Sequence, residues 1–169
     1  MACSMETAYF KHPLRFPDNA EGPFYTTGHL ARATIDPTSP LVWCGDCLWC
    51  GAPEAEAPTL FAPFDDTYTN TYFVRQPSTP EETEQAIMSA RVCCVSAVRY
   101  GGTNREIISK LGNDPAVCDY IVTESEQLKC TVASDGRLLP FAQKMVDARK
   151  AEFNRQWNKE NKKWWHFWR

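Results

Sequence analysis

The sequence predicts an α+β fold, in which short strands and two helices form a core that a long C-terminal helix extends. The 169-residue chain is long enough to bury a core without disulfides. Segments rich in β-branched and aromatic residues, at 24–27, 71–76 and the latter part of 92–100, predict strands. Helix start signals precede 80–92, and a long helical pattern begins at Phe141.

Composition divides the chain into three parts. Residues 1–40 are rich in Pro, Thr and Gly, so we expect an irregular N-terminal segment packed on the core, with one strand at 24–27 (FYTT). Residues 41–118 form the cysteine-rich core. Residues 119–169 hold a hairpin with Asp135-Gly136 at its turn, followed by a basic, Trp-rich helix.

Capping signals mark the two helices of the core. Thr79 as N-cap, Pro80 at the first helical position and Glu82 three residues after the cap predict the start of the longer helix. Thr103 and Glu106 form a second capping pattern, which predicts a short helix over the sequence REIISKLG.

The stretch WCGDCLWCGAP, residues 43–53, first suggests a redox dithiol. Its first five residues differ at one position from the WCGPC of thioredoxins. Such a dithiol begins a helix whose dipole lowers the pKa of the first thiol. Here Pro53 and Pro58 follow Cys47 too closely for an uninterrupted helix, so dithiol exchange is disfavoured.

The alternative is a ligand loop for iron or zinc. A cubane cluster bound by one polypeptide commonly takes three thiolates from a tight loop and a fourth from a distant position. Cys44, Cys47 and Cys50 share the tight spacing, and Cys93, at the end of the capped helix, supplies the distant thiolate. Cys94 is a poor replacement, because adjacent helical residues point ~100° apart.

At this point the chain resembles the single-cluster bacterial-type ferredoxins, over roughly residues 20–100. Their C-x-x-C-x-x-C loop is echoed by Cys44, Cys47 and Cys50, their A-P-x-x-F by 57–61, and their C-P-V-x-A-I by 93–98. The resemblance implies that residues 41–118 are a ferredoxin-like core with one cluster-binding loop. It also implies a [4Fe-4S] cluster as cofactor, held by these three cysteines and Cys93.

The sequence departs from the family pattern at Cys94, where the family has proline, and in the length of the loop. Counting back from the A-P motif places the third ligand at Pro53. In one register the third ligand is therefore missing. This register leaves three possibilities: the remaining three thiolates hold a [3Fe-4S] cluster, Cys44 supplies a fourth thiolate, or the cluster has been lost. In the other register, all three loop cysteines bind and the loop carries a three-residue insertion. Zinc also accepts four thiolates at this spacing.

These features predict an electron carrier rather than an enzyme, with single-electron transfer through one iron–sulfur cluster. The sequence has no signal-peptide pattern and no long apolar run, so we expect a cytoplasmic protein. The alternative is a non-catalytic protein-binding module, of regulatory or immunity/inhibitor type, on a ferredoxin-like scaffold with a structural metal or none. Pro53 favours the alternative, whereas the context of Cys93 favours the electron carrier.

Charge is segregated along the chain. From Gly136 onward nine Lys and Arg stand against three Asp and Glu, a charge of +6, and Met1 to Asp135 carries −9. We expect the acidic body to bind a redox partner, and the aromatic helix to pack on its own domain or on another protein. The acidic body disfavours nucleic acid, and the discontinuous apolar face around 158–163 disfavours membrane contact. The predicted apolar stripe comprises Phe141, Met145, Ala148, Phe153, Trp157 and Trp164.

Overall fold

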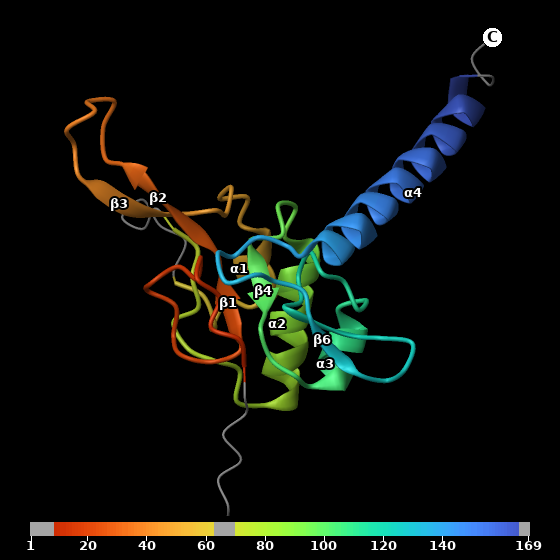
Figure 1. Cartoon of the computed structure of the whole chain (residues 1–169), viewed down its shortest axis with the longest axis horizontal. Helices are drawn as coiled ribbons and strands as arrows, with labels where there is room; N and C mark the ends of the chain where they lie inside the picture. The colour runs from red at the N-terminus through yellow and green to blue at the C-terminus, as the bar shows by residue number, and fades with distance from the viewer. Residues whose placement is uncertain (1–8, 63–69, 166–169) are drawn as a thin grey trace, which may run out of the picture.

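The computed structural model describes residues 9–62 and 70–165, with side chains through residue 159. Within them the strands pair as three antiparallel two-stranded sheets, β1–β4, β2–β3 and β5–β6 (Figure 1). This arrangement is α+β, as predicted. The elements are β1 (Phe24–Thr26), β2 (Gly28–Arg32), β3 (Leu41–Gly45), α1 (Ala52–Glu56), α2 (Pro80–Val92), β4 (Val98–Tyr100), α3 (Arg105–Lys110), β5 (Tyr120–Val122), β6 (Leu128–Cys130) and α4 (Pro140–Trp165).

The hydrophobic core lies where β1 and β4 meet α1, α2 and α3. Phe24 of β1 packs on Tyr100 of β4, with ring centroids 4.8 Å apart. Phe61 and Phe73 add a second ring pair at 4.3 Å, and both are almost completely buried. The predicted strand at 71–76 is wrong in extent, because Phe73 forms only an isolated bridge with Phe61.

A buried polar network joins the three parts of the chain. Tyr25 in β1 donates its hydroxyl hydrogen bond to Asp119 Oδ2 at 2.6 Å. Arg99 in β4 pairs with Asp119 Oδ1 at 2.8 Å, and the carboxylate is fully buried. The ring of His12 lies 5.6 Å from that of Tyr25. Early, middle and late segments therefore share one cluster that must form together.

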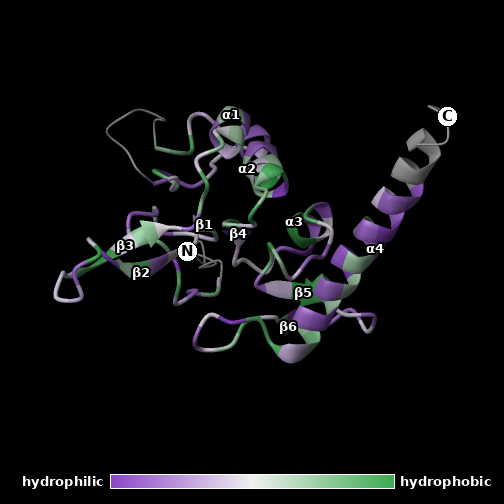
Figure 2. Ribbon diagram, turned by 90° about the horizontal axis from the view of Figure 1, so that it is seen from above, coloured by the Kyte–Doolittle hydropathy of each residue, from purple (hydrophilic) through white to green (hydrophobic). Residues whose placement is uncertain are grey.

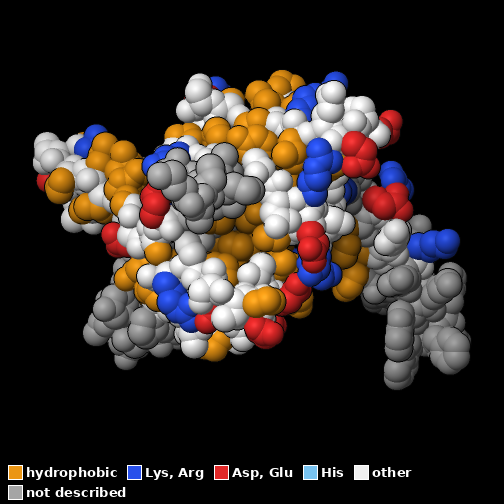
Figure 3. All heavy atoms as spheres, turned by 90° about the horizontal axis from the view of Figure 1, so that it is seen from below, with side chains coloured by type: hydrophobic (Ala, Val, Ile, Leu, Met, Phe, Trp, Pro, Cys, Tyr) orange, Lys and Arg blue, Asp and Glu red, His pale blue; other side chains and the backbone are white. Residues whose placement is uncertain are grey.

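The β2–β3 hairpin projects from the body, and the sequence did not predict it. Gly28 pairs with Gly45 and Arg32 with Leu41, so residues expected to be irregular form an antiparallel ribbon. A ribbon exposed on both faces lacks the alternating pattern that identifies a half-buried strand. Leu30, Ile35 and Leu41 are exposed along it, and Figure 3 shows hydrophobic side chains on this projection, at the left of the view.

The capping predictions are confirmed for α2 and off by one residue for α3. Thr79 Oγ1 accepts from the backbone N–H of Glu82 at 3.2 Å, as the capping pattern predicted. In α3 the cap is Asn104 rather than Thr103, because Asn104 Oδ1 accepts from the N–H groups of Glu106 and Ile107. Asparagine is among the best N-caps, so the cap still follows ordinary helix chemistry.

Helix α4 is present as predicted, but the predicted stripe is partly wrong. Ala142 and Val146 are buried against the body, whereas Ala148 is exposed. Beyond the body, Phe153 and Trp157 are 64% and 57% exposed. Helix α4 extends away from the other elements (Figure 1), and hydrophobic and hydrophilic residues alternate along it (Figure 2). Through residue 159, the outer part of the helix therefore does not pack on its own domain, contrary to one of the two expectations for the aromatic helix.

The predicted turn at Asp135-Gly136 is present, with Gly136 at φ 86° and an isolated bridge between Val132 and Leu138. The residues before it take part in a different pairing, because β6 pairs with β5 instead. None of the described helices is long and apolar enough to cross a membrane.

Candidate functional site

The candidate cysteines lie on three kinds of backbone. Cys44 lies in β3 opposite His29, so it belongs to a strand rather than to the loop that the sequence suggested. Cys47 and Cys50 follow in the segment between β3 and α1, where Cys47 is half-buried and Cys50 is exposed. Cys93 is the C-cap residue of α2 and is 7% exposed.

Cys47 and Cys93 lie near each other although they are 46 positions apart in the chain. Cys47 packs against the hydrophobic core cluster to which Cys93 belongs. Burial raises the pKa of the Cys47 thiol, and the nearby Cys93 and Glu54 raise it further. The neighbouring Thr71 side chain and the backbone N–H of Trp49 lower the pKa of this thiol and so act in the opposite direction.

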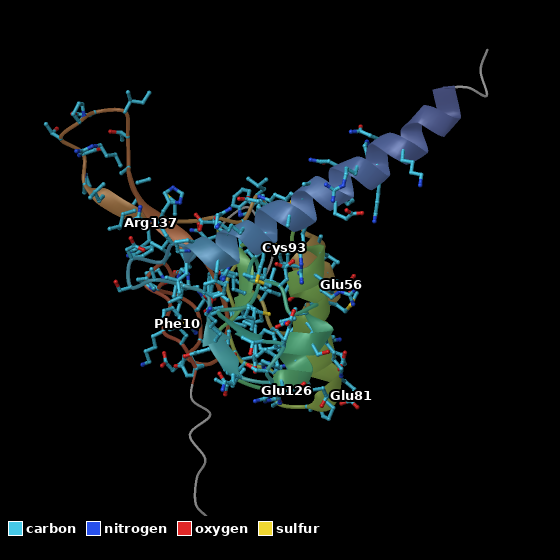
Figure 4. All side chains as sticks on the ribbon, turned by 45° about the vertical axis from the view of Figure 1, so that its right-hand side comes forward. Phe10, Glu56, Glu81, Cys93, Glu126 and Arg137 are labelled. Atoms are coloured by element: carbon cyan, nitrogen blue, oxygen red, sulfur yellow. The ribbon has the colours of Figure 1, made fainter. Side chains whose placement is uncertain are left out.

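Cys93 has a hydrogen-bond donor of its own. The backbone N–H of Ala97 donates to Cys93 Sγ at 3.2 Å, across the turn that joins α2 to β4. An N–H group aimed at sulfur stabilises negative charge there, as it does for a metal-bound thiolate. Figure 4 shows Cys93 in the interior of the body rather than on either projection.

A polar group beside Cys47 was missed in the sequence. Thr71 Oγ1 donates to Glu54 Oε1 at 2.5 Å, and Asn70 Oδ1 accepts from the N–H of Gly45 at 2.7 Å. The other oxygen of Glu54, Oε2, is buried and has no hydrogen-bond partner among the described residues. A buried acceptor without a partner is uncommon and marks this position as a candidate site. Its residues come from separate segments, and no spacing rule in the sequence links them.

The other two cysteines do not complete a ligand group in this structure. Within residues 9–62 and 70–165, no three His, Cys, Asp or Glu side chains lie together as metal ligands. The structure therefore places Cys47 against the core cluster that contains Cys93, and among the described residues no third His, Cys, Asp or Glu side chain joins them as a ligand.

Pro53 takes a structural position. It lies in the first turn of α1, where proline is well tolerated, and its side chain is buried in the core. Trp49 and Gly51 adopt φ values of 55° and 72°, so the chain turns sharply on both sides of Cys50 before α1 begins. Helix α1, which the sequence analysis missed, contains Pro53, the third-ligand position of one of the two registers.

An open pocket of about 340 Å³ gives access to Cys93 from the side of α3 and α4. Its lining is rich in basic side chains, from Arg91, Lys110 and Arg149. Arg149 belongs to α4 and pairs with Asp114 at 2.7 Å, so α4 contributes this side chain to the lining of the pocket. Cys118, by contrast, is buried, and burial raises the pKa of its thiol to about 12.

Comparisons with known proteins do not assign the chain to a class: no protein-family model, no curated protein and no solved structure matches it.

Proposed function

We propose that the protein transfers single electrons through one iron–sulfur cluster, held by Cys44, Cys47, Cys50 and Cys93 on a ferredoxin-like core. The observation that carries the proposal is the proximity of Cys47 and Cys93, which come from the cysteine stretch and from the end of α2. The resemblance to ferredoxins implies such a meeting between a loop cysteine and the remote cysteine.

The donor set fits the proposal in its chemistry. Four thiolates suit an iron–sulfur cluster, which when bound supplies a one-electron redox couple. Ala97 and Trp49 direct backbone N–H groups at Cys93 and Cys47, and these donors would help to set the potential. Glu54, whose Oε2 has no partner among the described residues, lies near Cys47. For all four thiolates to converge, the segment from Cys44 to Cys50 must adjust.

Electron exchange requires a surface on which a partner can dock. Leu48 and Trp49, between Cys47 and Cys50, are 67% and 41% exposed, and the β2–β3 hairpin beside them exposes further apolar side chains. The charge of −9 over residues 1–135 would favour a partner with a basic face. An exposed apolar patch beside the redox group, within an acidic body, suits a transient redox contact.

The test is the metal content and visible spectrum of protein purified anaerobically. We expect a broad thiolate-to-iron band near ~400 nm that bleaches with dithionite, together with stoichiometric iron and sulfide. Cys93→Ser should abolish the band. Cys94→Ser is the matched control, because Cys94 is adjacent but exposed, and this variant should retain the band.

Colourless protein with stoichiometric zinc would contradict the proposed electron transfer and would indicate a structural metal site.

In protein that does contain iron, the variant Cys44→Ser distinguishes the two registers. Loss of iron as complete as in Cys47→Ser supports the register in which all three loop cysteines bind and the loop carries a three-residue insertion. Unchanged iron content would mean that Pro53 stands at a lost third-ligand position.

The second candidate function is a non-catalytic protein-binding module on the same scaffold, with a structural metal or none. Two observations favour it: no three potential ligands converge among the described residues, and α4 exposes Phe153 and Trp157. Metal-free, stably folded protein that binds a partner through α4 would support this candidate and contradict the electron carrier.

A further inference from the structure

Helix α4 leaves the body after its first turns (Figure 1). Val146 is buried, and Arg149 pairs with Asp114 at 2.7 Å, so the body holds this part of the helix. From residue 147 to residue 159, every side chain is exposed. The body therefore fixes the direction of α4 and leaves the side chains beyond Val146 open to solvent.

Two open pockets adjoin at Arg149, where α4 leaves the body. The first, of about 340 Å³, is the pocket that gives access to Cys93. The second, of about 390 Å³, is lined by Lys150, Phe153 and Asn154, and Arg149 lines both pockets. We call the two pockets together the α4 groove, which runs from Phe153 past Arg149 to Cys93.

Both ends of the α4 groove present apolar surface. At the outer end Phe153 is 64% exposed, and its ring stacks on that of Trp157 with centroids 6.3 Å apart and planes 20° from parallel. At the inner end Leu111 and Val117 contribute to the lining. Two large rings exposed together beside a groove indicate a contact surface.

The charge of the α4 groove is mainly positive. Its charged side chains are Arg91, Lys110, Arg149 and Lys150, with one carboxylate, Asp114. Asp114 pairs with Arg149, and carboxylates outside the groove pair with Lys110. Arg91 and Lys150 have no carboxylate partner among the described residues, so two positive charges in the groove remain uncompensated.

The two carboxylates on the described outer part of α4 point away from the groove. Successive helical residues are rotated by about 100°, so Glu152 points about 100° and Asp147 about 120° away from Phe153. Glu152 pairs with Arg155, and Asp147 accepts a hydrogen bond from Gln143 Nε2 at 2.9 Å. The exposed ring and the free cations therefore share one side of the helix, and the negative charge lies elsewhere.

We propose that the α4 groove binds an acidic segment of a protein partner. An apolar side chain of the segment packs on Phe153, and its carboxylates pair with Lys150 and Arg91. Residues 1–135 carry a charge of −9, so the groove is a positive site on an acidic chain and selects partners by charge complementarity. The inference goes beyond electron transfer and does not depend on it, because the exposed ring and cations require no metal.

Shape and charge disfavour the other anionic partners. A bilayer surface is flat, whereas the groove consists of pockets beside the point where α4 leaves the body. The acidic body would be repelled by anionic lipids and by the continuous row of phosphates of a nucleic acid. A protein segment with a few carboxylates can instead pair locally with Lys150 and Arg91.

The test is the binding of a fluorescein-labelled peptide in which pairs of glutamates flank single leucines. Fluorescence anisotropy is measured as the full-length protein is titrated under reducing conditions. We expect saturable binding, and the same peptide with glutamine in place of glutamate should bind at least ~10-fold more weakly.

Substitutions then locate the binding site on the protein. Lys150→Glu, Arg91→Glu and Phe153→Ala should each raise the Kd of the glutamate peptide at least ~10-fold, because each removes a group that contacts the segment. Lys159→Glu is the matched control. It makes the same charge reversal at an exposed position about 120° around α4 from Phe153, and it should leave the Kd unchanged.

Four results would overturn the proposal. The first is a glutamate peptide that shows no saturable binding. The second is equal weakening by Lys159→Glu and Lys150→Glu, which would mean that net charge alone attracts the peptide. The third is binding of anionic vesicles or single-stranded DNA, but not of the peptide, through Lys150 and Phe153. The fourth is self-association in sedimentation velocity that Lys150→Glu and Phe153→Ala abolish, which would show that a second copy fills the groove.

Discussion

Removing the buried carboxylate of Asp119 should destabilise the whole protein. Asp119 is completely buried and accepts from Tyr25 at 2.6 Å and from two nitrogens of Arg99, at 3.1 and 2.8 Å. Asp119→Ala leaves the guanidinium of Arg99 buried without its counter-charge. Burial alone would lower the pKa of Arg99, but the charge of Asp119 raises it, so Arg99 remains charged in the folded protein.

The magnitude follows from the cost of an uncompensated buried charge. Removing one partner of a buried ion pair costs about 3–5 kcal/mol. Arg99 keeps its hydrogen bonds to the carbonyl oxygens of Pro115 and Ala116, which places the expected loss toward the lower end of that range. In a domain of this size each kcal/mol corresponds to about 2–4 °C, so a loss of about 3 kcal/mol should lower the melting temperature by about 6–12 °C.

The assay is urea unfolding followed by far-UV circular dichroism, with thermal melts alongside. Tyr25→Phe removes one hydrogen bond to Asp119 and keeps the ion pair, so it should cost about 1–2 kcal/mol. Asp135→Ala is the matched control: it breaks an exposed pair with Arg137 and should barely shift the transition. If Asp119→Ala unfolded at the same urea concentration as Asp135→Ala, the network would have no part in holding the three segments together.

Three further predictions concern single sites. Burial lowers the pKa of His12, so the unfolded state binds a proton more readily than the folded state. The free energy of unfolding should therefore fall as the pH drops below 6.5, and urea titrations of His12→Gln should show a smaller fall. Asn104→Ala removes the N-cap of α3 and should lower the free energy of unfolding in urea by about 1 kcal/mol. An unchanged free energy of unfolding would mean that Thr103, and not Asn104, is the N-cap. Phe73→Ala opens the core beside Phe61 and should cost about 3–5 kcal/mol, and a loss below 1 kcal/mol would contradict the packing described.

The features that the sequence predicted correctly are those encoded within a few residues. Thr79, Pro80 and Glu82 specify the start of α2 because a cap needs only its own first turn. The strands β1 and β4 follow from their β-branched and aromatic content, and their pairing puts Phe24 opposite Tyr100. Helix α4 was predicted because a long helical pattern begins at Phe141 and no proline or glycine follows it, and the helix spans Pro140–Trp165.

The features that the sequence missed depend on contacts between distant segments. The β2–β3 ribbon has no buried face of its own, so its residues lack a strand pattern, and Cys44 was placed in a loop instead of in β3. The Arg99–Asp119 pair joins residues 20 positions apart, and neither residue carries a local signal of its burial. Glu54 and Thr71 meet beside Cys47 for the same reason, although no motif connects them.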